Sequence, residues 1–253
     1  MTNKKWFGVI LLVIVIIVGI SMANKEPERT LVASGHPEWP PIMFRSGDTI
    51  DGAGPALVKK IFDELGVKTS FPYSGEWDEV QAKAKSGEVD VLVAAYKTTE
   101  RETYMDYSEA YTTDPVALFV KKGKEFEFSK NEELVGKRGV GMVGDSYGQA
   151  FDDFANSAIT LVRAKTADEA FKLLKEDKAD YFIYSLYAGE TELKAENAVA
   201  DFAFLPNYVT EEKFYITISK KSPFVKYMPD VNRLIEKYKV DGTTTALIEG
   251  FSQ

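Results

Sequence analysis

Apolar runs with strand character alternate with segments of helical periodicity, and this alternation occurs twice along the chain. In the first unit, Leu57, Ile61 and Leu65 recur every four residues, which predicts a helix over Pro55–Leu65. The run Val89–Ala95 is apolar almost throughout, as expected of a strand covered on both faces of a parallel sheet. Strands that alternate with helices in this way predict an α/β fold with crossover connections.

The same order of elements returns after a charged loop. This second unit is predicted to contain strands at Gly139–Val143, Ile159–Arg163 and Asp180–Tyr184, and a helix at Thr166–Lys175 that begins with a capping box. Because a domain typically needs about 100–200 residues, a chain of 253 residues has room for two such units. We therefore expect two α/β lobes.

The C-terminal segment decides how the lobes are connected. Phe214–Ser219 alternates like a strand, and helices are predicted over Val225–Tyr238 and Thr243–Phe251. A strand requires a sheet and the helices require a surface to cover, so we expect this segment to return to the first lobe. The chain would then cross between the lobes twice, which makes a hinge with a ligand cleft between the lobes.

These expectations divide the chain into defined parts. Lobe 1 is predicted to comprise residues 29–115 and 213–253, and lobe 2 residues 118–208. The two hinge crossings are predicted at 114–118 and 208–213.

The N-terminal segment has the pattern of an export signal. Lys4 and Lys5 precede the apolar run Trp6–Ile20, and Ser21-Met22-Ala23 follows, which is typical of a secretory signal cleaved after Ala23. Because the segment approaches the length of a membrane span, an uncleaved anchor is the alternative. Either reading predicts a periplasmic or extracytoplasmic location. The chain has no cysteine, which excludes disulfides, thiol catalysis and a lipid attached to cysteine.

Net charge excludes one class of partner. The formal charge is −8, and because residues 1–23 contribute two lysines and no acid, the remainder carries −10. Nucleic-acid binding requires a basic footprint, which is missing, so no nucleic-acid partner is expected. The acidity also disfavours adhesion to anionic lipid. With a single histidine and no cysteine, no metal or organic cofactor is expected.

Four stretches of the sequence, taken in order and spacing, resemble one known family. They are Gly35 with Trp39-Pro40-Pro41-Ile42-Met43-Phe44, Trp77-Asp78 with Lys85-Ser86-Gly87-Glu88-Val89-Asp90-Val91, Thr98-Thr99-Glu100-Arg101 with Asp106-Tyr107-Ser108, and Leu134-Val135-Gly136-Lys137 with Gly139 and Gly144-Asp145-Ser146. The chain is similar to the extracellular solute-binding proteins of family 3, the polar amino-acid uptake type. The resemblance implies a type II periplasmic-binding-protein fold, a monomer that closes on an amino acid or related carboxylate, and the permease of an ABC importer as partner.

The resemblance also assigns ligand contacts in the first lobe. It implies that Arg101 binds the ligand carboxylate, since a guanidinium presents a planar fork to two oxygens. The alternative is a surface arginine paired with Glu100 or Glu102. Thr98 would contribute a contact beside Arg101 or else cap the next helix. Trp39 aligns with the aromatic residue that packs on the ligand, or it fills the core.

Two further groups flank these candidates. His36 and Glu38 lie beside Trp39 in the sequence, and His36 is expected either to donate to an anionic ligand or to be a bystander. In the second lobe, Gly144–Gly148 is predicted to end a strand and begin a helix, where free backbone N–H groups bind anions. Ser146 would bind the ligand there, or Asp145 or Ser146 would cap the helix. On closure, Ser146, Tyr147 and Tyr184 are expected to cover the ligand.

Two positions depart from the family pattern. Ser185 stands where amino-acid binders usually have an aspartate for the ligand's ammonium, and a neutral hydroxyl cannot replace a carboxylate opposite a buried charge. Tyr96 stands where a small hydroxyl residue is common. Either Glu38, Asp145 or Glu190 supplies the missing negative charge, or the ligand is a carboxylate that has no ammonium group.

Two other functions remain as alternatives to a transport protein without enzymatic activity. An enzyme on the same scaffold, similar to cyclohexadienyl dehydratase, would need a cleft acid or base such as Glu38 or Glu190. A tethered sensor domain would follow if the N-terminal segment were not cleaved.

Overall fold

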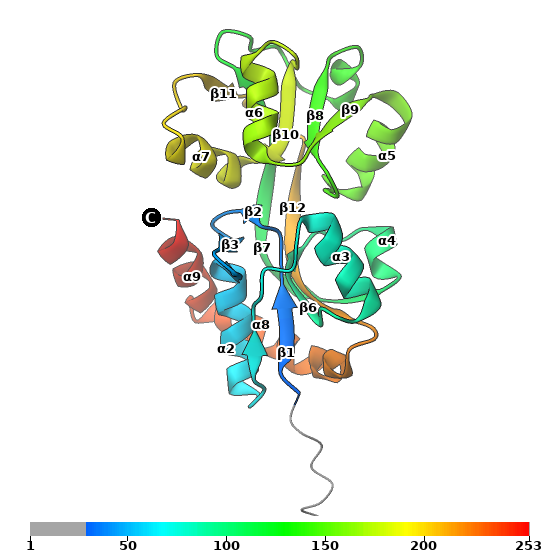
Figure 1. The fold of residues 1–253 in the computed structure, drawn as a ribbon, viewed down its shortest axis with the longest axis vertical. Coiled ribbons are helices and arrows are strands. Elements are labelled where there is room, and N and C mark those ends of the chain that lie inside the picture. Colours follow the sequence, from blue (N-terminus) through cyan, green and yellow to red (C-terminus); the bar gives the residue numbers. More distant parts are fainter. Residues whose placement is uncertain (1–28, 253) are drawn as a thin grey trace, which may run out of the picture. The chain divides into compact units, whose positions relative to one another are not determined.

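The structure is a computed structural model that describes residues 29–252, so the predicted signal or anchor at residues 1–23 lies outside the described part. From Leu31 onward the chain forms one compact unit. Two groups of helices and strands, one in the upper and one in the lower half of Figure 1, are joined by two long strands. Within the described residues, no helix combines the length and the apolar character that crossing a membrane requires.

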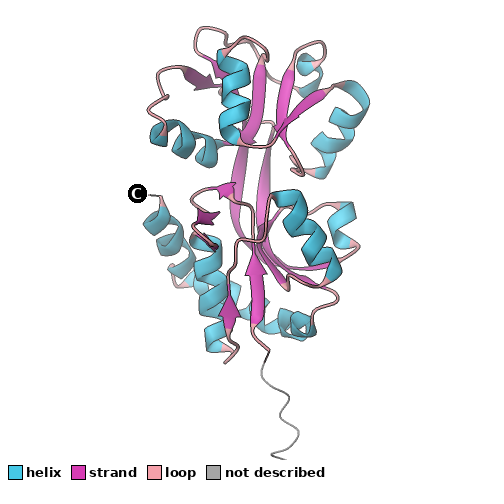
Figure 2. Ribbon diagram, viewed as in Figure 1, coloured by secondary structure: helices cyan, strands magenta, loops and turns pink. Residues whose placement is uncertain are grey.

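The first lobe has a parallel core of short strands. Its elements are β1 (Leu31–Ser34), β5 (Thr69–Ser70), β6 (Val91–Ala95), α2 (Ala53–Glu64), α3 (Trp77–Ser86) and the short α4 (Thr99–Glu102). β1 pairs in parallel with both β5 and β6. The predicted helix at 55–65 is confirmed, and it buries Leu57, Val58, Ile61 and Phe62. Figure 2 shows the helices flanking the strands in each lobe.

A small antiparallel sheet of β2 (Glu38–Trp39), β3 (Met43–Ser46) and β4 (Thr49–Asp51) adjoins this core. Its first strand, β2, was not predicted from the sequence. The reason is that β2 has only two residues, which is too short for period-two alternation to appear in the sequence. This sheet matters for the site because β2 carries Trp39.

Strands β7 (Met105–Lys121) and β12 (Thr210–Ser219) connect the two lobes. They pair antiparallel from Val116 with Thr210 to Met105 with Ser219. Beyond this region β7 continues into the second lobe, where residues 116–119 pair with β10 and residues 119–121 with β11. The sheet is therefore continuous, in the order β5-β1-β6-β12-β7-β10-β8-β9. The predicted crossings at 114–118 and 208–213 fall in this region, and the lobe boundaries stay a prediction.

The second lobe repeats the parallel arrangement. Its elements are η1 (Asn131–Leu134), β8 (Gly139–Met142), α5 (Gln149–Ala158), β9 (Leu161–Ala164), α6 (Ala167–Lys175), β10 (Tyr181–Ser185), α7 (Leu186–Ala195) and β11 (Phe202–Phe204). The three predicted strands are found within one or two residues of their expected bounds. Helix α7 was not predicted, because the buried positions of α7 include Ala188 and Gly189, which give a weak apolar stripe.

Two predicted helix starts have different outcomes. Thr166 caps α6 as predicted, since its Oγ1 accepts a hydrogen bond from the backbone N–H of Glu169 at 3.2 Å. The helix predicted from Gly144 begins only at Gln149, with Gly148 as the N-cap and no side-chain cap. The prediction that Asp145 or Ser146 caps this helix is therefore wrong. Gly148 has φ of 91°, a conformation that favours glycine over residues with a side chain.

The C-terminal helices cover the first lobe. η2 (Pro223–Tyr227), α8 (Met228–Val240) and α9 (Thr243–Phe251) follow β12, so the helix predicted over 225–238 is divided into a 3-10 turn and an α-helix. The phenol of Tyr238 on α8 donates to Glu64 Oε2 on α2 at 2.6 Å. The backbone N–H of Glu109 on β7 donates to Asn232 Oδ1 on α8 at 2.7 Å.

A buried carboxylate ties the returning segment to the first strand. Asp90 is fully buried, and its Oδ2 accepts from the backbone N–H of Val32 at 2.9 Å. Its Oδ1 accepts from the hydroxyl of Ser222, just after β12, at 2.7 Å. Asp90 therefore links β1 to Ser222, which lies 132 residues after Asp90 in the chain.

We expect Asp90→Ala to lower the free energy of unfolding by about 3 kcal/mol, because it leaves two buried donors without their charged acceptor. Urea unfolding at neutral pH measures this. Asp63→Ala is the matched control, since Asp63 pairs with Lys59 on an exposed face of α2 and its loss should change stability by less than about 0.5 kcal/mol. Equal effects of the two substitutions would contradict this role for Asp90.

Candidate ligand-binding site

A small cavity lies where both lobes contribute side chains. The first lobe supplies residues from the loop after β1 and from β2, β3, α3, β6, α4 and β12, and the second lobe supplies the loop after β8. The lining residues are His36, Trp39, Met43, Trp77, Ala94, Ala95, Tyr96, Arg101, Asp145, Ser146 and Phe214. Six of the predicted site residues therefore meet at one cavity, while Trp77, Met43 and Phe214 were not predicted.

Arg101 is buried, with 5% of its surface exposed. It lies on α4, whose N-cap Thr98 accepts from the backbone N–H of Arg101 at 3.2 Å. The capping alternative for Thr98 is therefore the one found, and Thr98 does not line the cavity. The alternative of a surface arginine is wrong, because Glu100 and Glu102 pair with lysines instead.

The Arg101 guanidinium is held by three acceptors. Its Nε donates to Gln81 Oε1 at 2.8 Å, its Nη1 to the carbonyl of Tyr96 at 3.2 Å and its Nη2 to the carbonyl of Gly144 at 3.3 Å. The group also lies 5.3 Å from the ring centroid of Trp77. Since a guanidinium has five N–H donors, these bonds leave one hydrogen on each terminal nitrogen, and the hydroxyl of Tyr104 also lies beside the group. Two such hydrogens can bind both oxygens of a carboxylate.

Asp114 does not line the cavity but accepts hydrogen bonds from three of the predicted site residues. Trp39 Nε1 donates to Asp114 Oδ2 at 2.8 Å, the Tyr96 hydroxyl donates to the same oxygen, and Ser185 Oγ donates to Oδ1 at 2.7 Å. Tyr96 and Ser185, the two departures from the family pattern, thus bind the same carboxylate. Ser185 does not line the cavity, so it does not stand in for the family's ammonium-binding aspartate.

Asp114 itself was missed, although the sequence carried a signal. It directly precedes the apolar run Pro115–Val120, and a carboxylate beside a strand covered on both faces must find donors. Burial raises the pKa of Asp114 to about 6 from 3.8, although the three donors act in the opposite direction. Desolvation therefore outweighs hydrogen bonding at this carboxyl.

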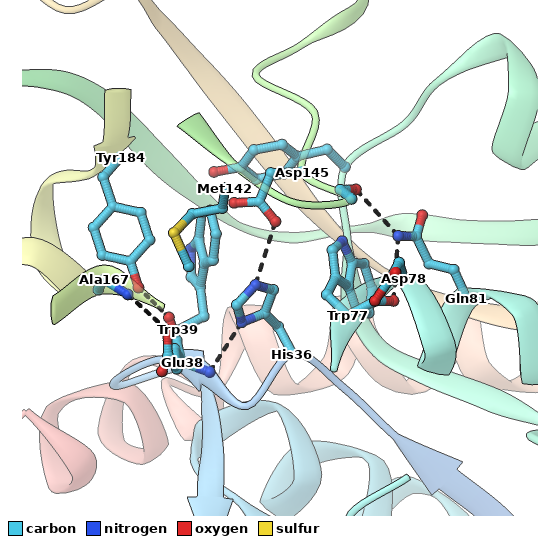
Figure 3. A network of polar contacts seen from close by, with 12 residues as sticks. His36, Glu38, Trp39, Trp77, Asp78, Gln81, Met142, Asp145, Ala167 and Tyr184 are labelled. Carbon is cyan, nitrogen blue, oxygen red and sulfur yellow. Dashed lines mark hydrogen bonds and ion pairs between the residues drawn. The ribbon is translucent and has the colours of Figure 1, made fainter. Parts of the chain in front are cut away.

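His36 lines the cavity and is held by contacts to both lobes. Its Nδ1 accepts from the backbone N–H of Glu38 at 2.9 Å, so the proton of the neutral ring is on Nε2. Nε2 lies 3.3 Å from Asp145 Oδ1, and both side chains are almost completely buried. Figure 3 shows the ring between this carboxylate and the backbone of Glu38, with Trp39 and Trp77 on its two sides. The ring centroids are 5.0 and 5.6 Å away.

Glu38 and Tyr184 connect the lobes instead of lining the cavity. Glu38 Oε2 accepts from the backbone N–H of Ala167, at the start of α6, at 3.0 Å. The Tyr184 hydroxyl donates to the carbonyl of Glu38, and its ring packs 5.0 Å from that of Trp39. Burial raises the pKa of Glu38. Tyr184 was predicted to cover the ligand directly. Its hydroxyl instead donates to Glu38 in the first lobe.

The loop between β8 and α5 is organised by Asp152. The Ser146 hydroxyl donates to Asp152 Oδ2, and the backbone N–H of Tyr147 donates to Oδ1 at 2.9 Å. The N–H of Gly148 donates to Ser146 Oγ at 3.2 Å. Two of the N–H groups predicted to be free for an anion, those of Tyr147 and Gly148, are therefore already bonded within the loop. Tyr147 is fully buried against Phe151 and does not line the cavity.

Two further possibilities are Glu190 as a site residue and a metal site. Glu190 lines a different hollow in the second lobe, together with Phe119, Leu193 and Phe204, and so does not face the cavity. Over residues 29–252, no group of three or more His, Cys, Asp or Glu side chains is arranged to hold a metal ion.

Two lobes joined by a pair of long strands, with a cavity between them that contains a buried arginine, define a two-lobed ligand-binding protein. The chain belongs to the bacterial extracellular solute-binding proteins, family 3, whose sequence profile matches residues 31–253. The family resemblance is confirmed, as is the type II periplasmic-binding-protein fold.

Three similar proteins show the range of this fold. The L-cystine-binding protein TcyJ of Escherichia coli is 25% identical over 237 residues, which cover 90% of this chain and 85% of TcyJ. An ancestral arginine-binding protein, solved with bound arginine, has a TM-score of 0.73 and 27% identity, and the match covers 89% of this chain and 99% of that one. A histidine kinase sensor domain has a TM-score of 0.74 at 20% identity, with 88% and 96% covered, and shows the fold alone. The first two are binding proteins.

We expect the stability of the wild type to fall as the pH rises from 4 to 7, relative to Asp114→Asn. The pKa of Asp114 in the folded state, about 6, lies above its ordinary 3.8, so its stabilising contribution is complete below 3.8 and is lost as the pH rises through 6. The difference in free energy of unfolding should change by about 3 kcal/mol in favour of the variant. Urea unfolding at several pH values measures it.

Tyr96→Phe provides a second check on Asp114. This variant removes one donor to the ionised carboxylate, so it should raise the pKa further and move the loss of stability to higher pH. Parallel stability curves for the wild type and Asp114→Asn would contradict the assignment.

Proposed function

We propose that this protein captures an amino acid or related small carboxylate outside the cytoplasm and delivers it to the permease of an ABC importer. The observation that carries the proposal is the Arg101 guanidinium, which is buried and has two N–H groups left for a carboxylate. The ligand occupies the cavity that Arg101 lines, and the protein acts as a monomer without turnover. The relatives TcyJ and the arginine-binding protein, named for amino-acid ligands, support this ligand class.

Hinge closure is the proposed mechanism of capture. The ligand first contacts Trp39 and Arg101 on the first lobe, and the second lobe then closes. Closure forms the hydrogen bonds from Arg101 and Gln81 to the carbonyl of Gly144, at 3.3 and 3.1 Å, and the bond between Tyr184 and Glu38. Exclusion of water strengthens the pairing of Arg101 with the carboxylate, because the charges then interact at lower dielectric.

We expect Arg101→Lys to weaken ligand binding roughly 30-fold or more, since a point charge replaces the planar fork. Isothermal titration calorimetry with the ligand found by screening measures this. Arg233→Lys is the matched control, because Arg233 pairs with Asp230 on an exposed face of α8 and should leave affinity unchanged. A fully retained affinity in Arg101→Lys, with the fold intact by circular dichroism, would remove Arg101 from the proposed site.

The size of the cavity bears on which amino acid is bound. The volume open in this structure is about 20 Å³, roughly the room that one water molecule needs. Trp39, Trp77 and Tyr96 occupy much of its wall. We therefore propose a ligand with a short side chain, unlike the L-cystine of TcyJ.

Thermal unfolding with a panel of amino acids and organic acids tests the size preference. A bound ligand at about 100 times its Kd stabilises the native state by roughly 2.7 kcal/mol, which raises Tm. Alanine, serine and small hydroxy acids should raise Tm more than L-cystine or L-arginine at equal concentration. A larger shift with L-cystine than with every small ligand would show that the cavity opens further than proposed.

The alternative enzyme would need an acid or base in the cavity. Glu38 and Glu190, which the dehydratase alternative named, do not line it, whereas His36 and Asp145 do and contact each other. We propose binding without chemical change. Incubation with a prephenate-like acid, followed by absorbance and mass spectrometry, should show no product. Turnover that is lost in Glu38→Gln would restore the dehydratase reading.

A further inference from the structure

Asp145 has a buried carboxylate with one close polar neighbour, the ring of His36. Its side chain is 1% exposed. Apart from the contact with His36 Nε2, neither carboxylate oxygen has a hydrogen-bond partner among residues 29–252. Most buried carboxylates are paired or accept several hydrogen bonds, because an uncompensated buried charge is costly. Asp145 lines the same cavity as Arg101, so the carboxylate is available to whatever the cavity holds.

His36 is the one ionisable neighbour found within ion-pair distance of Asp145 in the described part of the chain, at 3.3 Å. Because Nδ1 of His36 accepts from the backbone N–H of Glu38, the ring is neutral with its proton on Nε2. The imidazole therefore presents a neutral N–H to Asp145 and not a compensating positive charge. Arg101 does not provide that charge either, because its three bonds go to Gln81, Tyr96 and Gly144.

We infer that Asp145 binds a cationic group of the ligand, so that the cavity selects zwitterions through Arg101 and Asp145 together. This inference rests on the proposed function and narrows its ligand class to amino acids rather than simple carboxylates. The charge that Ser185 lacks is thus supplied from the loop after β8 in the second lobe. Of the other two candidates, Glu38 bonds to Ala167 and Glu190 lines a separate hollow.

The position of Asp145 couples recognition to closure. Asp145 belongs to the second lobe and Arg101 to the first, and the cavity is small enough for one ligand molecule to reach both. A ligand with both charges therefore contributes attraction across the hinge, whereas a simple carboxylate brings its negative charge toward Asp145. Affinity and closure should both depend on the ammonium group.

The test compares matched ligands in the wild type and in Asp145→Asn. Calorimetry with L-alanine, propanoate and ethylamine, and with L-glutamine, 4-carbamoylbutanoate and 4-aminobutanamide, separates the contributions of the two charges. In the wild type each amino acid should bind at least about 30-fold more tightly than its analogue without the amino group. In Asp145→Asn the amino acid should lose about 30-fold and the simple carboxylate should gain, so that the two come within about threefold.

Stability without ligand provides a second readout. Because Asp145→Asn removes an uncompensated buried charge, its Tm without ligand should rise. Asp153→Asn is the matched control: it makes the same change on an exposed face of α5, where Asp153 accepts from Gln149, and should alter neither Tm nor affinity.

The outcomes separate this inference from the proposed function. Equal wild-type affinity for amino acids and for their analogues without the amino group, or an unchanged preference in Asp145→Asn, would overturn the role of Asp145 and leave the proposed function standing. A fall in Tm of Asp145→Asn with unchanged affinity would assign Asp145 a structural role beside His36. Failure of the wild type to bind any amino acid or carboxylate would overturn both.

Discussion

Strands β7 and β12 exchange backbone hydrogen bonds from Val116 to Met105, and the other strands of the large sheet attach to this pair directly or through a neighbour. Either strand alone would present unpaired backbone groups where it passes between the lobes. When paired, each strand satisfies the backbone groups of the other, and the lobes are joined by this pair and by side-chain contacts such as those of Glu38 with Ala167 and Tyr184. A backbone pair can bend without losing its hydrogen bonds, which suits a protein that must open and close.

Buried charge is concentrated around this connection. Asp114 lies on β7 and accepts hydrogen bonds from both lobes, through Trp39 and Tyr96 on one side and Ser185 on the other. Asp145 faces the cavity with few partners, whereas Asp114 has three. The two carboxylates therefore have different consequences. Asp114 fixes the position of the aromatic wall within the protein, while Asp145 requires a partner from outside it.

Much of the fold was predictable because the strands and helices of both lobes follow their expected periods. The return of the C-terminal segment to the first lobe also followed from a simple need, since β12 requires a sheet and α8 a surface. Helix α7 was missed because Ala188 and Gly189 weaken its apolar stripe. The start of α5 was placed too early, because Gly148 rather than Asp145 or Ser146 provides the cap.

The site was predictable only in part, for a physical reason. Arg101, Trp39 and His36 were found through local motifs and their chemistry. The partners of Asp114 could not be predicted, because they lie 18, 71 and 75 residues away, and pairing over such distances leaves no local pattern. For the same reason Tyr96 and Ser185 looked like two independent departures from the family, although one carboxylate accounts for both. Asp152 likewise occupies a position that the local glycine pattern suggested for a ligand.

Gly144 sets how far the lobes can approach. Its φ is 78°, and a Cβ atom added there would lie 3.1 Å from the backbone nitrogen of Asp78 and 3.2 Å from its Cβ, across the cavity in the first lobe. The two lobes thus approach closely at this point, and a side chain at residue 144 would require Asp78 to move by a few tenths of an ångström. The positive φ also favours glycine here. The close approach in which the carbonyl of Gly144 accepts from Arg101 therefore occurs at a residue that has no side chain.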